Sequence, residues 1–210
     1  MYLLVIKMKN RKWLIIGLSI LFVILTILAK LDLLVSIDTF FYKLVTSNIN
    51  DSATKFYRVI TFLGSTKFIV FLCVAFLVLF IILKKKNTGL IITGAILLST
   101  IVNNVLKLII RRERPDVIKF VHESSFSFPS GHTMAAVTMY GILMYIVLKS
   151  GINKTLKIVL SIILGIIPIL VAISRIYLGA HFTSDVVGAF IMSIILLLVS
   201  TYYIDKKNWL

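Results

Sequence analysis

The sequence is poor in cysteine and in acidic residues. Cys73, the one cysteine, lies inside an apolar run, so no disulfide can form within the chain. Only 8 Asp and Glu oppose 23 Lys and Arg, which gives a formal net charge of +15. No internal repeat or low-complexity tract is present. The basic segment Met1–Lys12 leads into a long apolar run without a small-residue exit, so we expect an uncleaved first span and not a signal peptide.

Apolar residues are abundant and decide the class of protein. They make up 60% of the chain, and the mean hydropathy is +1.05. A water-soluble domain of this size does not carry such a composition, so the sequence indicates a membrane protein. The excess of positive charge would point to nucleic acid in a soluble protein. Here we expect no nucleic-acid partner, and we assign the cations to the membrane surface or to an anion site.

Six apolar runs approach the length of about 20 residues that a helix needs to cross the hydrocarbon core. We therefore expect an all-α membrane protein with six transmembrane helices, and a single integral membrane domain over residues 1–210. The expected spans cover about residues 13–29, 68–83, 90–110, 133–148, 156–173 and 186–203.

The segment between the first two spans mixes polar and apolar residues with helical spacing. Residues 36–47 and 52–64 are predicted as two amphipathic helices on the membrane surface. Ser36–Asp38 and Asn50–Ser52 are expected to cap their N-termini. Two interpretations stay open: simple surface packing, or a wall beside an entrance for lipid.

An even number of spans places both termini on one side of the membrane. The short segments on that side are uniformly basic, which predicts that they face the cytoplasm; they include Lys84–Lys86, Lys149–Lys157, Lys206 and Lys207. The total numbers of Lys and Arg on the two sides are nearly equal, so this prediction depends on the short segments. The remaining polar loops would then face outward, in a multi-pass protein of the cell membrane.

Three polar segments fall at helix ends on that outward side. They read KLIIRRERP from Lys107 to Pro115, FPSGH from Phe128 to His132, and SRIYLGAHFTSD from Ser174 to Asp185. Although they are far apart in sequence, all three can converge on one membrane face.

The first and third segments supply cations. Lys107 and Arg114 are seven residues apart, which would place them on one face of a helix together with Arg111. With Arg175 they offer fixed positive charges that suit a tetrahedral oxyanion. Snorkelling to the membrane surface could explain any one of them alone.

The second segment opens a helix. Ser130 is a favourable N-cap, and the first helical turn leaves backbone N–H groups free to bind an anion. Gly131 allows a ligand to approach the backbone closely.

The histidines indicate the reaction. His181 and Asp185 stand at positions i and i+4, so a helix would let the carboxylate orient the imidazole as a nucleophile. His132, at the start of the helix, is placed to protonate a leaving oxygen. His122 belongs to no comparable group, and neither it nor Glu123 receives a role. We expect no metal ligand and no cofactor.

Taken together, K-x6-R-P, P-S-G-H and S-R-x5-H-x3-D resemble the three-part signature of the type-2 phosphatidic acid phosphatase superfamily. The resemblance covers residues 107–185 and implies metal-free hydrolysis of a lipid phosphate. It also implies roles: His181 attacks phosphorus, Asp185 orients it, and His132 acts as acid and then as base. The phosphate oxygens would be held by Lys107, Arg114, Ser130, Gly131 and Arg175.

The expected substrate follows from the outward site and from small bacterial relatives in that superfamily. Undecaprenyl diphosphate is expected first; phosphatidylglycerophosphate, or several glycerophospholipid phosphates, are the alternatives. Two other classes also remain open, a lipid or ion transporter and a vanadate-dependent haloperoxidase. The sequence makes no prediction of the oligomeric state.

Overall fold

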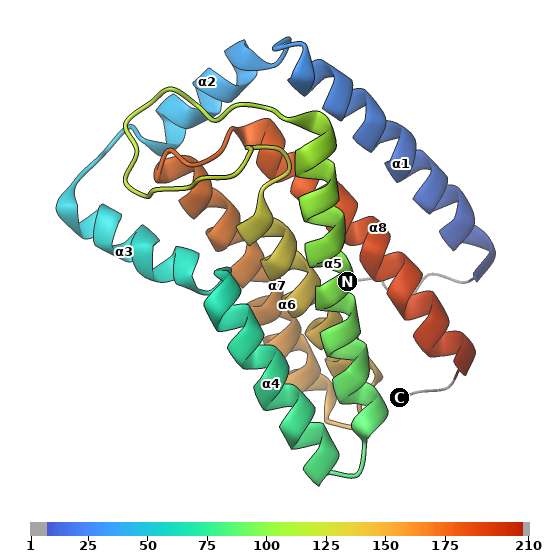
Figure 1. Cartoon of the computed structure of the whole chain (residues 1–210). Coiled ribbons are helices and arrows are strands. Elements are labelled where there is room, and N and C mark those ends of the chain that lie inside the picture. The colour runs from blue at the N-terminus through green and yellow to red at the C-terminus, as the bar shows by residue number, and fades with distance from the viewer. Residues whose placement is uncertain (1–7, 208–210) are drawn as a thin grey trace.

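The computed structural model describes residues 8–207, so residues 1–7 of the basic N-terminal segment lie outside the described part. Within residues 8–207 the chain forms eight helices and no strand (Figure 1). Helices suit apolar runs in a membrane because every backbone N–H and C=O inside them is paired within the segment. The helices are α1 Met8–Lys30, α2 Val35–Val45, α3 Asp51–Phe62, α4 Thr66–Ile82, α5 Lys86–Ile110, α6 Gly131–Lys149, α7 Lys154–Tyr177 and α8 Thr183–Lys207.

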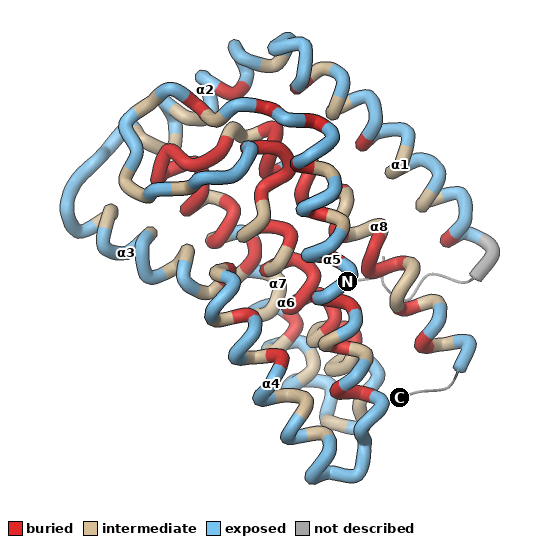
Figure 2. The backbone as a smooth tube through the Cα atoms, viewed as in Figure 1, coloured by how far each residue is buried: buried red, intermediate tan, exposed pale blue. Residues whose placement is uncertain are grey.

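Helix α6 is the centre of the bundle. It packs against α4, α5, α7 and α8, whereas α1 lies along the outside of α8 (Figure 1). Met139, Ile142 and Tyr145 of α6 are fully buried, and buried positions concentrate on α6 and on the facing sides of its neighbours (Figure 2). The outward faces of the peripheral helices expose Leu, Ile, Val and Phe, as a lipid-facing surface does.

Five helices are long and apolar enough to cross a membrane: α1, α5, α6, α7 and α8. A sixth span forms if α3 and α4 are taken together, although they are bent by 42° where they meet. Gly64 lies at that bend, where a Cβ atom would stand 2.9 Å from the carbonyl oxygen of His132. Glycine therefore lets the bend lie directly against the start of α6. The predicted all-α membrane fold is confirmed.

Helices α2 and α3 lie across one end of the bundle (Figure 1). In α2, Ile37, Phe40 and Leu44 are exposed, while Asp38 is buried on the inner side. Asn50 caps α3 by accepting a hydrogen bond from the Ala53 N–H, as predicted. The predicted cap at Ser36–Asp38 is wrong, because α2 begins at Val35 and the Asp38 carboxylate instead binds Arg112 and Ser184.

The opposite end of the bundle is held by Asp205. Its carboxylate accepts from Arg11 of α1 at 2.9 Å, from Lys149 of α6 at 2.9 Å, and from the Tyr145 hydroxyl. One side chain of α8 therefore ties the peripheral α1 to the central α6. Its position is about 30 Å from the polar loops, because α6 rises about 1.5 Å per residue over its length.

Removing this carboxylate is predicted to weaken the bundle without changing the chemistry. Asp205→Ala should lower the melting temperature in detergent, since loss of one partner of a half-buried ionic cluster costs about 1–3 kcal/mol. The turnover number at a permissive temperature should stay within about twofold of wild type. Asp116→Ala, on an exposed loop residue, is the control and should leave the melting temperature unchanged. An unchanged melting temperature in Asp205→Ala would contradict the role of Asp205 in joining α1 and α8 to α6.

Candidate active site

Two loops at the same end of the bundle carry the polar side chains. The longer loop joins α5 to α6, and the shorter one joins α7 to α8. A hydrogen bond joins the two loops: the Phe120 N–H donates to the Leu178 carbonyl at 3.1 Å. Gly179 has φ +69°, and a Cβ there would meet the Ile118 carbonyl oxygen at 2.2 Å. This tight turn therefore needs glycine. The turn places His181, two residues later, at the end of the bundle.

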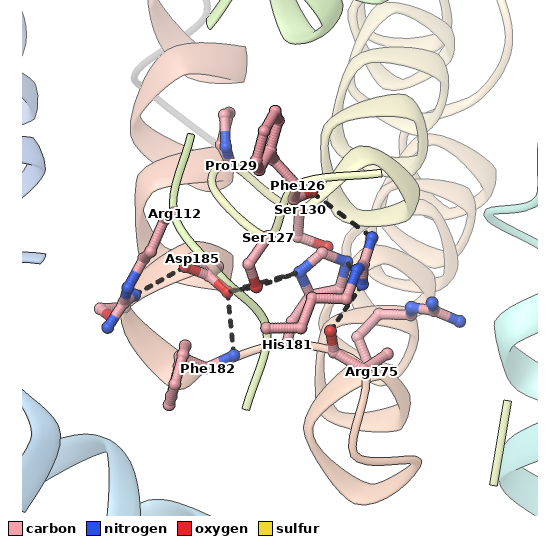
Figure 3. Close-up of polar contacts among 12 residues, drawn as sticks. Arg112, Phe126, Ser127, Pro129, Ser130, Arg175, His181, Phe182 and Asp185 are labelled. Atoms are coloured by element: carbon pink, nitrogen blue, oxygen red, sulfur yellow. Dashed lines mark hydrogen bonds and ion pairs between the residues drawn. The ribbon is translucent and has the colours of Figure 1, made fainter. Parts of the chain in front are cut away.

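His181 and Asp185 form a buried pair (Figure 3). Nδ1 of His181 lies 3.4 Å from Oδ2 of Asp185, and the same oxygen accepts from the Phe182 N–H at 2.9 Å. The expectation that both residues share a helical face is wrong, because α8 begins only at Thr183. The pair forms instead across the first turn of α8, with the carboxylate bonded back to the preceding backbone.

His181 is uncharged near neutral pH. Burial lowers its pKa to about 3, the charges of Arg175 and Arg114 act in the same direction, and Asp185 only partly opposes them. With Nδ1–H directed to Asp185, Nε2 keeps its lone pair. That atom lies 3.3 Å from a guanidinium nitrogen of Arg114. A neutral imidazole oriented in this way has the properties of a nucleophile.

Arg114 and Lys107 are positioned by different elements, the long loop and the last turn of α5. Helix α5 ends at Ile110, and Arg111 adopts a left-handed conformation with φ +52°. Lys107 and Arg114 therefore do not share a helical face, contrary to the prediction, and the loop returns Arg114 to His181. Arg114 also donates to the carbonyls of Ser125 at 2.7 Å and Ala180 at 2.6 Å.

Lys107 is buried at the last turn of α5, where its ammonium group donates to the Phe126 carbonyl. Arg111 takes no part in this cluster; it is exposed and donates to the Leu108 carbonyl of its own helix.

The start of α6 presents backbone donors. Gly131 and His132 open the helix and line the cavity described below. Ser130 is at the N-cap position as predicted, but its hydroxyl pairs with Thr133 at 2.9 Å and makes no capping bond. Its N–H donates to the Asp185 carbonyl at 3.2 Å. The structure therefore uses Ser130 to join α6 to α8, and the first-turn N–H groups of α6 need partners from outside the helix.

Glu123 lies among the predicted cations, and the sequence analysis assigned it no role. Its carboxylate pairs with Arg175, and it lies 3.8 Å from Arg114 and 3.9 Å from Nδ1 of His132. Arg175 is almost fully buried and also donates to the Thr61 hydroxyl at 2.8 Å. Glu123 therefore stands between Arg175 and the cavity.

Two further residues, Ser127 and Arg112, bind Asp185 and were also missed. The Ser127 hydroxyl donates to Oδ2 of Asp185, and Arg112 donates to Oδ1 at 2.7 Å. Both residues lie in the loop between α5 and α6, outside the spacing pattern that singled out the other residues. His122 is exposed in the same loop.

A cavity of about 270 Å³ opens between α5, α6 and the two loops. Seven of its lining residues bear the relevant chemistry: Asn103, Asn104, Lys107, Arg114, Glu123, His132 and His181. A second cavity of about 530 Å³ adjoins it and shares Asn104, Lys107, Arg114 and Ser125; Leu108 and Phe126 add apolar surface to it. The site thus combines a charged cavity that has room for a phosphate group with a larger, less polar neighbour. Among residues 8–207, no group of three or more His, Cys, Asp or Glu is arranged to hold a metal ion.

Cations, a helix N-terminus and a histidine paired with an aspartate at one end of a membrane bundle are an arrangement that suits binding and transfer of a phosphoryl group. The family comparison agrees: residues 88–209 match the model of the PAP2 superfamily, and the chain belongs to that superfamily. It is thus a multi-pass membrane hydrolase of lipid phosphates, of a kind that acts without a metal cofactor.

Named relatives support this assignment. Phosphatidylglycerophosphatase B of Bacillus subtilis is 40% identical over 149 residues, which cover 70% of this chain and 73% of that protein. The crystal structure of a transmembrane PAP2-type phosphatidylglycerolphosphate phosphatase from Bacillus subtilis matches with a TM-score of 0.84 at 34% identity, covering 91% of this chain and 96% of the other. Aquifex aeolicus LpxE matches with a TM-score of 0.62 at 27% identity, covering 77% and 93%.

The charge of Glu123 predicts a pH-dependent stability. Burial opposes its ionisation, but Arg175, His132 and Arg114 outweigh burial, so its pKa lies below the ordinary 4.5. A lowered pKa contributes stability that is present above pH 4.5 and is lost as the pH falls through the folded-state value. Glu123→Gln should therefore melt below wild type at pH 7, and this difference should shrink as the pH falls below about 4.5.

Glu113→Gln, an exposed neighbour in the same loop, is the matched control and should show no such trend. A gap between Glu123→Gln and wild type that stays constant from pH 7 to pH 4 would contradict the ionised state of Glu123.

Proposed function

We propose that this phosphatase removes the terminal phosphate of phosphatidylglycerophosphate through a phosphohistidine intermediate on His181. The observation that carries the proposal is the placement of neutral His181 Nε2 beside Arg114 at a cavity of about 270 Å³, with Asp185 behind the ring. A phosphate monoester is tetrahedral and anionic, and it fits the cations and N–H donors of this cavity.

In the first step Nε2 of His181 attacks phosphorus, and the bond from phosphorus to the ester oxygen breaks. Asp185 stabilises the positive ring that results, because its carboxylate accepts from Nδ1–H. His132 protonates the departing alkoxide, and its Nδ1 lies 3.9 Å from the carboxylate of Glu123.

In the second step His132 takes a proton from water, and the resulting hydroxide attacks the phosphohistidine. The phosphorus–nitrogen bond breaks, inorganic phosphate leaves, and His181 returns to its neutral form. Lys107, Arg114 and the N–H groups of Gly131 and His132 stabilise the equatorial oxygens in both steps. Arg175 acts from behind Glu123, which it holds at the edge of the cavity.

The choice of lipid is supported by the relatives. The curated relative and the solved structure from Bacillus subtilis both carry phosphatidylglycerophosphate phosphatase activity in their names. The adjoining cavity of about 530 Å³ has room for the glycerol linker beside the scissile phosphate, and the exposed Asn104 and Ser125 offer polar contacts to its hydroxyl groups.

Undecaprenyl diphosphate is the second candidate and is favoured by the expected orientation. Lys84–Lys86 and Lys149 line a basic pocket at the end of α5 and α6 opposite the histidines. We propose that this end is cytoplasmic together with both chain termini, so that the catalytic loops face outward. An outward site is where a diphosphate lipid carrier would be dephosphorylated for reuse.

His181→Ala is predicted to abolish turnover of phosphatidylglycerophosphate in mixed micelles, because no other group can form the covalent intermediate. Asp185→Asn should retain the nucleophile but lose about 10³- to 10⁴-fold in kcat, as when the carboxylate partner of a catalytic histidine is removed. His122→Ala, an exposed histidine of the same loop, is the control and should keep wild-type activity. Phosphate release by folded His181→Ala above background would refute the assignment.

Substrate and orientation can be tested together. The kcat/KM for phosphatidylglycerophosphate should exceed that for undecaprenyl diphosphate or phosphatidic acid by about tenfold or more, since a polar linker contact distinguishes them. In intact cells, Lys119→Cys should react with a membrane-impermeant maleimide, and Gly151→Cys should react only after lysis. A Cβ atom added at Gly151 would meet no other atom within 4 Å, so the change is tolerated there.

Cys73 is buried and should not interfere with the labelling. The reverse labelling pattern would contradict the outward orientation, and a preference for undecaprenyl diphosphate would replace the proposed substrate.

A further inference from the structure

Behind the His181–Asp185 pair lies a second charged pair, Arg112 and Asp38. Arg112 donates to Oδ1 of Asp185 at 2.7 Å (Figure 3). It also donates to Oδ2 of Asp38 at 3.0 Å, so one guanidinium group bridges two carboxylates. Ser184 completes the group: its N–H and hydroxyl donate to Asp38 at 2.8 and 2.7 Å, and Arg112 also donates to that hydroxyl at 2.7 Å.

This group is buried, which makes it unlike a surface ion pair. The exposed fractions of Arg112, Asp38 and Asp185 are 5%, 2% and 0%. Desolvating three charges is expensive unless the geometry satisfies them, and hydrophobic side chains of similar size would often serve stability as well. The position of this group beside the His181–Asp185 pair therefore points to a role in orienting the carboxylate.

The geometry shows how Arg112 can act on His181. Asp185 has two oxygens with separate partners: Oδ1 faces Arg112, and Oδ2 faces His181, Ser127 and the Phe182 N–H. Holding Oδ1 fixes the rotation of the carboxylate, and this in turn fixes Oδ2 against Nδ1 of His181. The guanidinium group is itself fixed by Asp38 and by the Phe182 ring, whose centroid lies 4.1 Å from its central carbon.

Asp38 brings a surface helix into this arrangement. It projects from the inner side of α2, whose opposite side exposes Ile37, Phe40 and Leu44. An apolar face of this kind suits the membrane interface. This surface helix is thus bonded, through Arg112, to the carboxylate behind the nucleophile.

We propose that Arg112 and Asp38 are positioning residues for the reaction: Asp38 holds Arg112, and Arg112 orients and partly neutralises Asp185 as the partner of His181. The proposal rests on the roles given above to His181 and Asp185. Neither Arg112 nor Asp38 touches the substrate; both act through Asp185.

The test distinguishes three effects of changing Arg112: loss of its charge, loss of its hydrogen-bonding geometry, and unfolding of the protein. It measures kcat and the acid limb of kcat/KM against pH for phosphatidylglycerophosphate, with Arg112→Gln, Arg112→Lys and Asp38→Asn as variants. The acid limb reports protonation of the free enzyme's nucleophile. The charged and titratable groups that face His181 are Asp185 from α8, Arg114 from the long loop, Arg175 from α7 and His132 from α6.

Arg112→Gln should lower kcat by about 10- to 100-fold, as loss of an orienting partner commonly does. It should also move the acid limb to higher pH, because Asp185 without its cation favours a protonated His181. Asp38→Asn should lower kcat too, but its acid limb should stay or move to lower pH, because Arg112 is then less neutralised. Arg112→Lys keeps the positive charge but cannot donate to Asp185 and Asp38 in the same geometry. Its kcat should therefore fall, while the acid limb of kcat/KM stays at the wild-type pH.

Arg111→Gln is the matched control, since Arg111 is the exposed neighbour of Arg112, and it should behave as wild type. If the single variants do not fold, Asp38→Asn combined with Arg112→Gln removes both charges together, and it should still show the upward shift of the limb. Folding is checked by the elution volume and melting temperature in detergent.

Three results would overturn the proposal. The first is a wild-type kcat and pH profile in Arg112→Gln or in the double variant. The second is an equal upward shift of the acid limb in Asp38→Asn and Arg112→Gln, and the third is an acid limb in Arg112→Lys at the same pH as in Arg112→Gln. Equal upward shifts would mean that water enters a loosened site. His181→Ala is assayed in parallel. If that variant is active, the proposed function itself fails, whereas an inactive His181→Ala beside an unaffected Arg112→Gln refutes only the positioning role.

Discussion

The structure around the site depends on one buried carboxylate, Asp185. Groups from both loops are bonded to this residue: the His181 ring, the Ser127 hydroxyl, the Phe182 N–H and the Arg112 guanidinium group bind its side chain, and Ser130 binds its carbonyl. A carboxylate without such partners could not be buried, because desolvation of the charge costs far more than packing returns. The requirement to satisfy Asp185 therefore brings the ends of α5, α6 and α8 to one place.

The second constraint is where charge can be placed in a membrane protein. Cations within a span are costly unless they face a polar cavity or the membrane surface. Here Lys107, Arg114 and Arg175 lie at or beyond helix ends. Lys107 and Arg114 line a cavity of about 270 Å³, and Arg175 is bound to Glu123 at its edge. Glu123 offsets part of their mutual repulsion. This position allows a lipid to keep its chains in the bilayer while its head group enters a charged site.

Much of this arrangement could be predicted from the sequence, for identifiable reasons. Hydropathy identified the helices because apolar runs in a membrane have one stable conformation. Two short motifs singled out His132, His181 and Asp185, and the structure brings these residues to one end of the bundle. The periodicity argument failed for Lys107 and Arg114, because α5 ends in a left-handed residue at Arg111. Glu123, Arg112 and Asp38 were not predicted, because the contacts Glu123–Arg175, Arg112–Asp185 and Asp38–Arg112 join residues 52 to 74 positions apart and no local pattern records such contacts.

The central claim is that His181 carries the phosphoryl group between the two chemical steps. The direct measurement uses phosphatidylglycerophosphate labelled with ³²P in its terminal phosphate, with turnover stopped in alkaline detergent on the millisecond scale, where phosphohistidine survives. Peptide mapping should place the label on His181, and His181→Ala should carry no label. Label on another residue, or product release at the wild-type rate with no labelled protein at any time, would contradict the account.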